Sequence, residues 1–215
     1  MKRNYFLRWT WGLIIRPYIK EINGLKNLPK KGPYIIVANH SSVADDFLII
    51  YLHVKNCSKS KFGAIARFRS NKKSIFQKIV IHTLKIYCNS FFAIISALKK
   101  NIIQKSVKVL KQGNVLLVFP EGYHATNELL KAKTGAIRIA LEAKVPIIPI
   151  GLINADKVLP KNAYLPRFRR VTINIGKKYD ISKYYGKQDD RKIVNELTRI
   201  MMKKVAKLCN KEYNY

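Results

Sequence analysis

The chain has 215 residues, 48% of them hydrophobic, which suits one globular domain with a sizeable core and argues against disorder. Forty-two Lys and Arg residues against twelve Asp and Glu residues give a formal net charge of +30. A surface so positive attracts polyanions, so composition points to nucleic acid or to an anionic membrane face without choosing between them.

Three features are not predicted: a site or framework built on cysteines, a membrane-spanning helix and a signal peptide. The three cysteines share no close spacing, so neither a disulfide framework nor a CxxC zinc site is supported, and we expect buried thiols in a reducing compartment. The longest uncharged apolar stretch, Ile86 to Leu98, is shorter than the roughly 18 residues of a spanning helix. We expect no signal peptide, because Arg8 and Arg16 interrupt the first apolar residues.

Residues from about 5 to 20 are predicted to form an amphipathic helix, in which aromatic side chains alternate with Arg and Lys. This pattern suits a helix lying in a bilayer interface, and it equally suits a helix packed on its own domain. We assign residues 1–22 to an amphipathic, membrane-associating helical segment and residues 23–215 to one domain. Gly24 to Pro33 is predicted to be a turn-rich connector.

The rest of the chain alternates between strand and helix patterns. Short apolar runs predict strands at 34–38, 62–66, 84–87, 115–119, 147–152 and 171–175. Helical patterns lie at 47–52, 74–82, 93–111, 128–143 and 189–211. This alternation predicts an α/β domain with a largely parallel central sheet flanked by helices.

Two of the predicted strands end in polar residues, and the carboxyl ends of strands are where α/β sheets carry their sites. After the first strand, His40 and Asp45 are five residues apart across a strand-to-helix turn. A carboxylate on one imidazole nitrogen raises the basicity of the other, which can then take a proton from an attacking hydroxyl. Taken alone, such a pair is more often a helix cap.

The second segment is Phe119-Pro120-Glu121-Gly122, at the end of an apolar strand. Gly122 allows a tight turn. A carboxylate at Glu121 can bind a substrate hydroxyl, or it can hold a loop by accepting backbone N–H bonds. The two segments together, in this order, are more specific than either alone.

Together these segments resemble the PlsC-type glycerolipid acyltransferases, which include 1-acylglycerol-3-phosphate acyltransferases. The family's N-H-x4-D block matches Asn39-His40 and Asp45, and its F-P-E-G block matches residues 119–122. Val145 to Ile150 matches a V-P-I-x-P block, Lys133 to Ala136 a K-x-G-A element, and residues 24–33 the approach to the first strand. The resemblance covers about residues 22–180.

The resemblance implies transfer of a fatty acyl group from acyl-CoA or acyl carrier protein to a lipid hydroxyl, with no metal or redox cofactor. It makes 23–215 the acyltransferase domain, His40 the general base and Asp45 its orienting partner. The implied location is peripheral, on the cytoplasmic face of an anionic membrane, with a lipid acceptor and an acyl donor as partners and no nucleic acid. We assign substrate binding to Asn39, Ser42, Phe119, Pro120, Glu121, Gly122, His124 and Lys133.

The chain departs from the family where the family binds phosphate. F-P-E-G is usually followed by Thr-Arg, but Tyr123 and His124 follow here, and Ile86 to Ser90 lacks the usual second Arg. Arg suits phosphate because its planar fork binds two oxygens and stays charged. A non-phosphate lipid or sugar alcohol is therefore an alternative acceptor. Basic residues from another loop are candidate replacements: Arg67, Arg69, Lys72 and Lys73.

Two other functions remain as alternatives. A nucleic-acid-binding protein fits the charge, but no zinc-finger, RRM or KH signature is present and the basic residues are spread along the chain. A non-catalytic lipid-binding relative fits the missing Arg residues, whereas the presence of His40, Asp45 and Glu121 argues against it.

Overall fold

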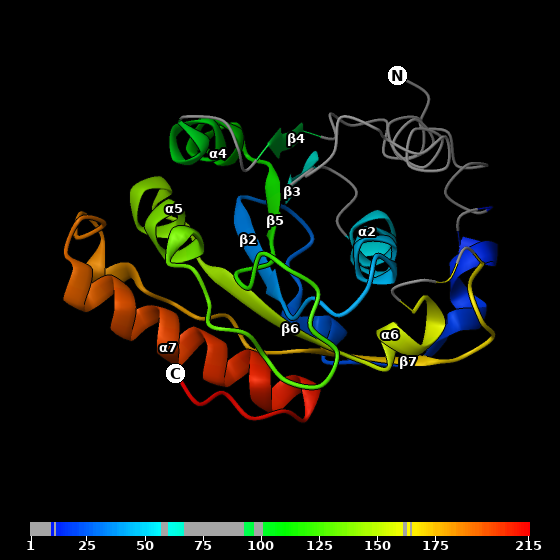
Figure 1. Ribbon diagram of the computed structural model, residues 1–215. Helices are drawn as coiled ribbons and strands as arrows, with labels where there is room; N and C mark the ends of the chain where they lie inside the picture. Colours follow the sequence, from blue (N-terminus) through cyan, green and yellow to red (C-terminus); the bar gives the residue numbers. More distant parts are fainter. Residues whose placement is uncertain are drawn as a thin grey trace, which may run out of the picture.

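The computed structural model describes residues 10, 12–56, 60–66, 93–96, 101–160, 163 and 165–215. Within them, seven strands form one sheet in the order β1-β7-β6-β2-β5-β3-β4 (Figure 1). The strands are β1 (Ile19–Asn23), β2 (Tyr34–Ala38), β3 (Phe62–Ala66), β4 (Ala93–Ser96), β5 (Val115–Val118), β6 (Ile147–Ile153) and β7 (Val171–Ile175).

The sheet is largely parallel, as the alternating pattern predicts. β2 pairs in parallel with both β5 and β6, β3 pairs in parallel with β4 and β5, and β1 pairs in parallel with β7. The antiparallel pair is β6 with β7. Because β2 lies between β5 and β6, the carboxyl ends of these three strands meet at one edge of the sheet.

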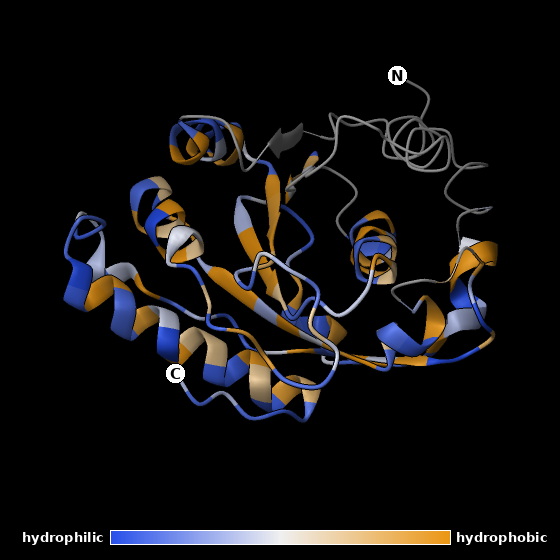
Figure 2. Cartoon of the chain, viewed as in Figure 1, coloured by the Kyte–Doolittle hydropathy of each residue, from blue (hydrophilic) through white to orange (hydrophobic). Residues whose placement is uncertain are grey.

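Helices cover both faces of the sheet (Figure 1). One face packs against α2 (Ala44–Asn56) and α6 (Ala155–Val158), and the other against α4 (Ile102–Lys111), α5 (Gly135–Ala143) and α7 (Arg191–Cys209). Successive residues of β2 enter the two cores in turn, which explains why this strand is apolar throughout. Figure 2 shows orange strands between helices whose outer faces are blue. The prediction of an α/β domain is confirmed.

The N-terminal helix ends earlier than predicted. Helical residues at 12–15 continue into a 3-10 turn, η1 (Arg16–Tyr18), and β1 begins at Ile19. Ile19 and Ile22 are three residues apart, a spacing that also fits a helix, so the pattern did not reveal the edge strand. The division proposed at residue 22 falls within β1, and residues 1–9 lie outside the described part of the chain.

Two other helices were predicted too long. The span 93–111 contains β4 followed by α4, and α5 begins at Gly135, not at Glu128. Residues 128–134 run without helix, and their N–H groups bond elsewhere: Leu130 and Lys133 donate to the Phe119–Gly122 turn, and Ala132 donates to the Tyr213 hydroxyl. The predicted elements at 74–82 and 84–87 lie outside the described residues. The short 3-10 turns η2 (Leu25–Asn27) and η3 (Ser182–Tyr184) complete the described elements.

None of the helices described here is both long and apolar enough to cross a bilayer. The cysteine thiol within the described residues, that of Cys209, is buried and unpaired, as expected of a small core residue.

Candidate active site

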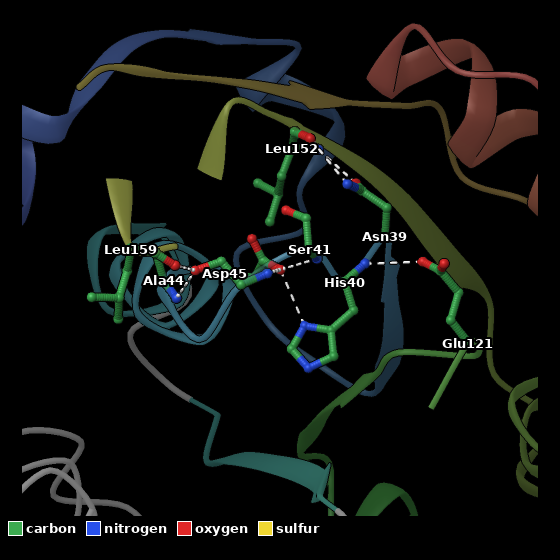
Figure 3. A network of polar contacts seen from close by, with 9 residues as sticks. Asn39, His40, Ser41, Ala44, Asp45, Glu121, Leu152 and Leu159 are labelled. Carbon is green, nitrogen blue, oxygen red and sulfur yellow. Dashed lines mark hydrogen bonds and ion pairs between the residues drawn. The ribbon is translucent and has the colours of Figure 1, made fainter. Parts of the chain in front are cut away.

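The two polar segments predicted from sequence lie together at the carboxyl edge of the sheet. β2 and β5 are parallel neighbours, so the residues that follow Ala38 and Val118 leave the sheet side by side. The backbone N–H of His40 donates to Oε1 of Glu121 over 3.0 Å, and the His40 carbonyl accepts from the N–H of Ala125 over 2.8 Å. Figure 3 shows this junction.

His40 and Asp45 form the central pair of the site (Figure 3). Nδ1 of His40 lies 3.1 Å from Oδ2 of Asp45, in the first turn of α2. The same oxygen accepts the backbone N–H groups of Ser41 at 2.6 Å and Ser42 at 2.9 Å. The Asp45 side chain is fully buried, while 14% of the His40 side chain is exposed. With its proton on Nδ1, the ring presents an unprotonated Nε2 to an incoming hydroxyl.

Burial governs the electrostatics of the pair. It raises the pKa of Asp45 to about 7, although the N–H bonds from Ser42 and Ser41 act in the opposite direction. Oδ1 of Asp45 is buried without a hydrogen-bond partner among the described residues. Burial also lowers the pKa of His40, against the nearby charge of Asp46. A lowered pKa leaves the imidazole neutral at physiological pH, as a general base requires.

Two aromatic rings hold the imidazole in place. The Phe119 ring stacks on it with centroids 3.9 Å apart and planes 9° from parallel. The His124 ring meets it edge-on at 4.0 Å and 77°. Because both rings come from the segment after β5, that segment fixes the orientation of the His40 ring as well as its backbone.

Glu121 connects three parts of the chain. Its Oε1 accepts the N–H of His40, and its Oε2 accepts the N–H of Leu130 over 2.8 Å. The side chain is buried, and desolvation raises its pKa against the effect of these two N–H bonds. Of the two roles considered for this carboxylate, these contacts favour that of holding a loop, and its role in substrate binding stays a prediction.

Asn39 and Ser42 bond the turn after β2 to other parts of the chain, Asn39 to the end of β6 and Ser42 to the residue after α6. The buried Asn39 amide donates to the Leu152 carbonyl over 3.0 Å and accepts the N–H of Leu152 over 2.8 Å. The Ser42 hydroxyl donates to the Leu159 carbonyl over 2.6 Å and accepts the N–H of Ala44. These contacts position the turn, and the predicted substrate-binding roles of both residues stay untested.

The turn at Gly122 carries a lysine beside it. Gly122 has φ of +72°, a left-handed conformation that favours glycine. A Cβ placed there would lie 3.3 Å from Nζ of Lys133, and that Nζ is 5.6 Å from the centroid of the Tyr123 ring. The Lys133 N–H donates to the Pro120 carbonyl over 2.9 Å. The K-x-G-A and F-P-E-G elements are therefore adjacent in space.

Sequence reasoning found the side chains of the site but missed their backbone partners. The carbonyls of Leu152 and Leu159 and the N–H of Leu130 complete the site, and backbone groups leave no signature in the residue type. The four basic residues suggested as replacements for the family's Arg lie outside the described part of the chain. A groove of about 770 Å³ lies elsewhere, between the 131–134 segment, α7 and the C-terminal tail.

Comparison with known proteins agrees with this site. A model of the family described as Acyltransferase matches residues 20–153, more than half of the chain and both polar segments. The chain therefore belongs to the acyltransferase family. The predicted enzyme class, an O-acyltransferase of the PlsC type, is confirmed.

Individual relatives share this class. The chain is 26% identical over 178 residues to a 1-acyl-sn-glycerol-3-phosphate acyltransferase of Borreliella burgdorferi, covering 81% of this chain and 68% of that protein. It is 28% identical over 169 residues to a chloroplastic enzyme of the same name from Brassica napus, covering 74% of this chain and 45% of that protein. The fold is similar to that in the crystal structure of PlsC, the 1-acyl-sn-glycerophosphate acyltransferase of Thermotoga maritima. The match has a TM-score of 0.67 and 21% identity, and it covers 99% of this chain and 83% of that one.

Proposed function

We propose that the enzyme transfers a fatty acyl group from a thioester donor to the free hydroxyl of 1-acyl-sn-glycerol-3-phosphate. The observation that carries this proposal is the His40–Asp45 pair, with a buried carboxylate at 3.1 Å from Nδ1 and a ring whose other nitrogen faces away from it (Figure 3). The names of the relatives in Borreliella burgdorferi and Brassica napus supply the acceptor.

The proposed reaction is direct acyl transfer without an acyl-enzyme. Nε2 of His40 takes the proton of the acceptor hydroxyl as its oxygen attacks the thioester carbonyl. The His40 ring becomes an imidazolium, which the Asp45 carboxylate stabilises through its contact with Nδ1. When the tetrahedral intermediate collapses, the carbon–sulfur bond breaks, the ester is complete, and the proton on His40 passes to the departing thiolate. The donor is acyl-CoA or acyl carrier protein, and no cofactor takes part.

Lys133 is our candidate for the cation that holds the acceptor phosphate. Its ammonium lies beside the turn at Gly122, two residues before His124, which stands where the family has Arg. An ammonium binds phosphate as a point charge and without the two-pronged fork of Arg. The replaced Arg favours, as a second candidate, an acceptor that lacks phosphate.

We place the enzyme at the cytoplasmic face of a membrane, as a peripheral protein. The acceptor is a lipid, and the charge of +30 suits an anionic leaflet, where each Lys or Arg near the surface contributes about 1 kcal/mol. Val43 and Tyr123, in the two active-site segments, are 41% and 44% exposed and offer apolar contacts to a lipid that approaches the site.

The proposal is tested with purified full-length protein and labelled acyl donors. Acyl-CoA and acyl carrier protein are compared in parallel on three acceptors: 1-acylglycerol-3-phosphate, 1-acylglycerol-3-phosphocholine and 1-acylglycerol. We expect transfer to the phosphate acceptor and its loss in His40→Ala at an unchanged unfolding temperature. Turnover of His40→Ala at the wild-type rate would refute the assignment of the general base.

The acceptor head group has its own pair of variants. Lys133→Met should raise KM for the phosphate acceptor about tenfold or more, as expected for a lost charge-assisted contact. Lys131→Met, two residues away and also exposed, should leave KM unchanged. A wild-type enzyme that prefers 1-acylglycerol over its phosphate ester would instead support the second candidate acceptor.

A further inference from the structure

A cluster of exposed apolar side chains lies away from the residues used in catalysis. Leu165 and Phe168, between α6 and β7, are 77% and 66% exposed, and Leu13 and Ile14, in the N-terminal helical segment, are 54% and 56% exposed. These are four of the seven large hydrophobic side chains that are exposed in the described part of the chain. Apolar side chains gathered in this way mark an interaction surface.

The two segments are in contact although about 150 residues separate them in the sequence. The rings of Tyr18 and Phe168 lie 6.1 Å apart between centroids. Figure 1 shows the blue N-terminal segment beside the yellow chain that leads from α6 to β7. We refer to Leu13, Ile14 and residues 165–170 together as the docking patch.

The docking patch is strongly cationic as well as apolar. Arg167, Arg169 and Arg170 alternate with or follow its apolar residues, and all three side chains are exposed. Among the described residues none of the three forms an ion pair with an acid. Arginine beside exposed aromatic and aliphatic side chains suits an interface between water and anionic head groups, where the apolar groups enter the acyl boundary.

The chain that carries the patch is tied to the active site. The Arg167 N–H donates to the Val158 carbonyl over 2.7 Å, and the next carbonyl, that of Leu159, accepts the hydroxyl of Ser42. Ser42 is three residues before Asp45 and donates its backbone N–H to that carboxylate. A surface bound at the patch is therefore held near the turn that carries the catalytic pair.

We propose that residues 165–170 of the docking patch form a second membrane contact, beside that of the amphipathic N-terminal segment, and that the occupant of the docking patch is an anionic lipid bilayer. The charge of the patch and its apolar side chains complement such a surface together, whereas an acidic protein would need the arginines alone. Its role in supplying the lipid acceptor rests on the proposed function. Its binding to lipid does not, because vesicle binding requires no catalysis.

The test is co-sedimentation of the full-length protein with vesicles of phosphatidylglycerol and phosphatidylcholine in equal parts. The variant Arg167→Gln, Arg169→Gln, Arg170→Gln should bind about a hundredfold more weakly, at about fivefold for each cation removed. Leu165→Ser should weaken binding about tenfold through loss of apolar burial. Because Leu165 is 77% exposed, this variant keeps the test informative if the triple variant folds poorly.

A matched control removes the same charge from another part of the molecule. Lys187→Gln, Arg191→Gln, Lys192→Gln also lowers the formal charge from +30 by three, to +27, at exposed positions around the start of α7. This control and His40→Ala should bind as the wild type does. The proposal is overturned if both triple variants weaken binding equally, or if neither does. A third result would also overturn it. If the variant with Arg167, Arg169 and Arg170 replaced binds vesicles normally but loses transfer from acyl carrier protein, the occupant is an acidic protein.

Discussion

Replacing Glu121 with glutamine separates the two roles considered for this carboxylate. Each of its oxygens accepts a backbone N–H, from His40 at 3.0 Å and from Leu130 at 2.8 Å. A glutamine has the same shape but one acceptor oxygen, so its amide group must face one of the two N–H donors. If Glu121 holds the site together, Glu121→Gln removes one buried hydrogen bond and sets two donors against each other.

The expected loss of stability in Glu121→Gln follows from this geometry. Leaving one buried N–H unsatisfied costs about 1–3 kcal/mol, so we take about 2 kcal/mol for Glu121→Gln. In a domain of this size 1 kcal/mol corresponds to about 2–4 °C in Tm, which gives a decrease of about 4–8 °C. Glu128→Gln, at an exposed position in the following segment, is the control and should change the free energy of unfolding by less than about 0.5 kcal/mol.

Thermal unfolding and steady-state kinetics together distinguish the two roles of Glu121. A positioning role predicts a lower Tm and a lower kcat with little change in KM for the acceptor, because the His40 backbone loses its support. An acceptor-binding role predicts the reverse, a raised KM at an unchanged Tm. If Glu121→Gln and Glu128→Gln unfold at the same temperature, the reasoning from the two N–H bonds is refuted.

Three further outcomes are expected. Asp45→Asn should lower kcat by about 10²–10⁴-fold in the same assay, because the amide oxygen that keeps the N–H bonds of Ser41 and Ser42 carries no charge to stabilise the imidazolium, and a loss below tenfold would contradict this. In the wild type, kcat/KM should rise with pH through about 7, the pKa of Asp45. Below that pKa the Asp45 carboxyl is protonated and cannot stabilise an imidazolium. A flat pH–rate profile would exclude this titration. Gly151→Ala should destabilise the protein in urea by about 1–3 kcal/mol or more, because its Cβ would lie 2.3 Å from the carbonyl carbon of Leu208 in α7. Gly135→Ala, with nothing within 4 Å, should unfold at the wild-type urea concentration or above, and equal stability of the two variants would contradict the packing argument.

The central strands could be predicted because burial on both faces leaves a direct mark on composition. β2 and β5 are apolar at every position, and buried polar residues follow within three positions, Asn39 after β2 and Glu121 after β5. The order of strand and helix then placed both polar segments at the carboxyl edge of a parallel sheet. That inference required only local patterns and the topology rules of α/β folds.

The edge strands were missed for the opposite reason. β1 buries Ile19 alone among its five residues, and its partner β7 begins about 150 residues later. β4 has only four residues, Ala93–Ser96, and they fit the start of the following helix equally well. In both cases the strand is defined by a distant partner, and no local pattern contains that information.

The same limit applies to the site. Asn39 and Glu121 were predicted to bind substrate, which stays a prediction, and in the structure each side chain bonds to backbone groups of other elements. A residue type states how many hydrogen bonds a side chain can form, and the fold decides which partners it meets. His124 shows this too, since its contact with the His40 ring follows from the turn at Gly122.

The excess positive charge and the catalytic machinery are separate in this protein. Within the described residues, neither buried carboxylate of the site pairs with Lys or Arg, and both are held by backbone N–H groups. A guanidinium beside Asp45 would compete with His40 for the carboxylate and reduce the basicity that the pair supplies. The described cations lie elsewhere, and they include Lys133 beside the Gly122 turn and the three arginines of the docking patch. Under the proposed function, this arrangement would let the surface attract anionic lipid while the pair that moves the proton stays free of strong positive charge.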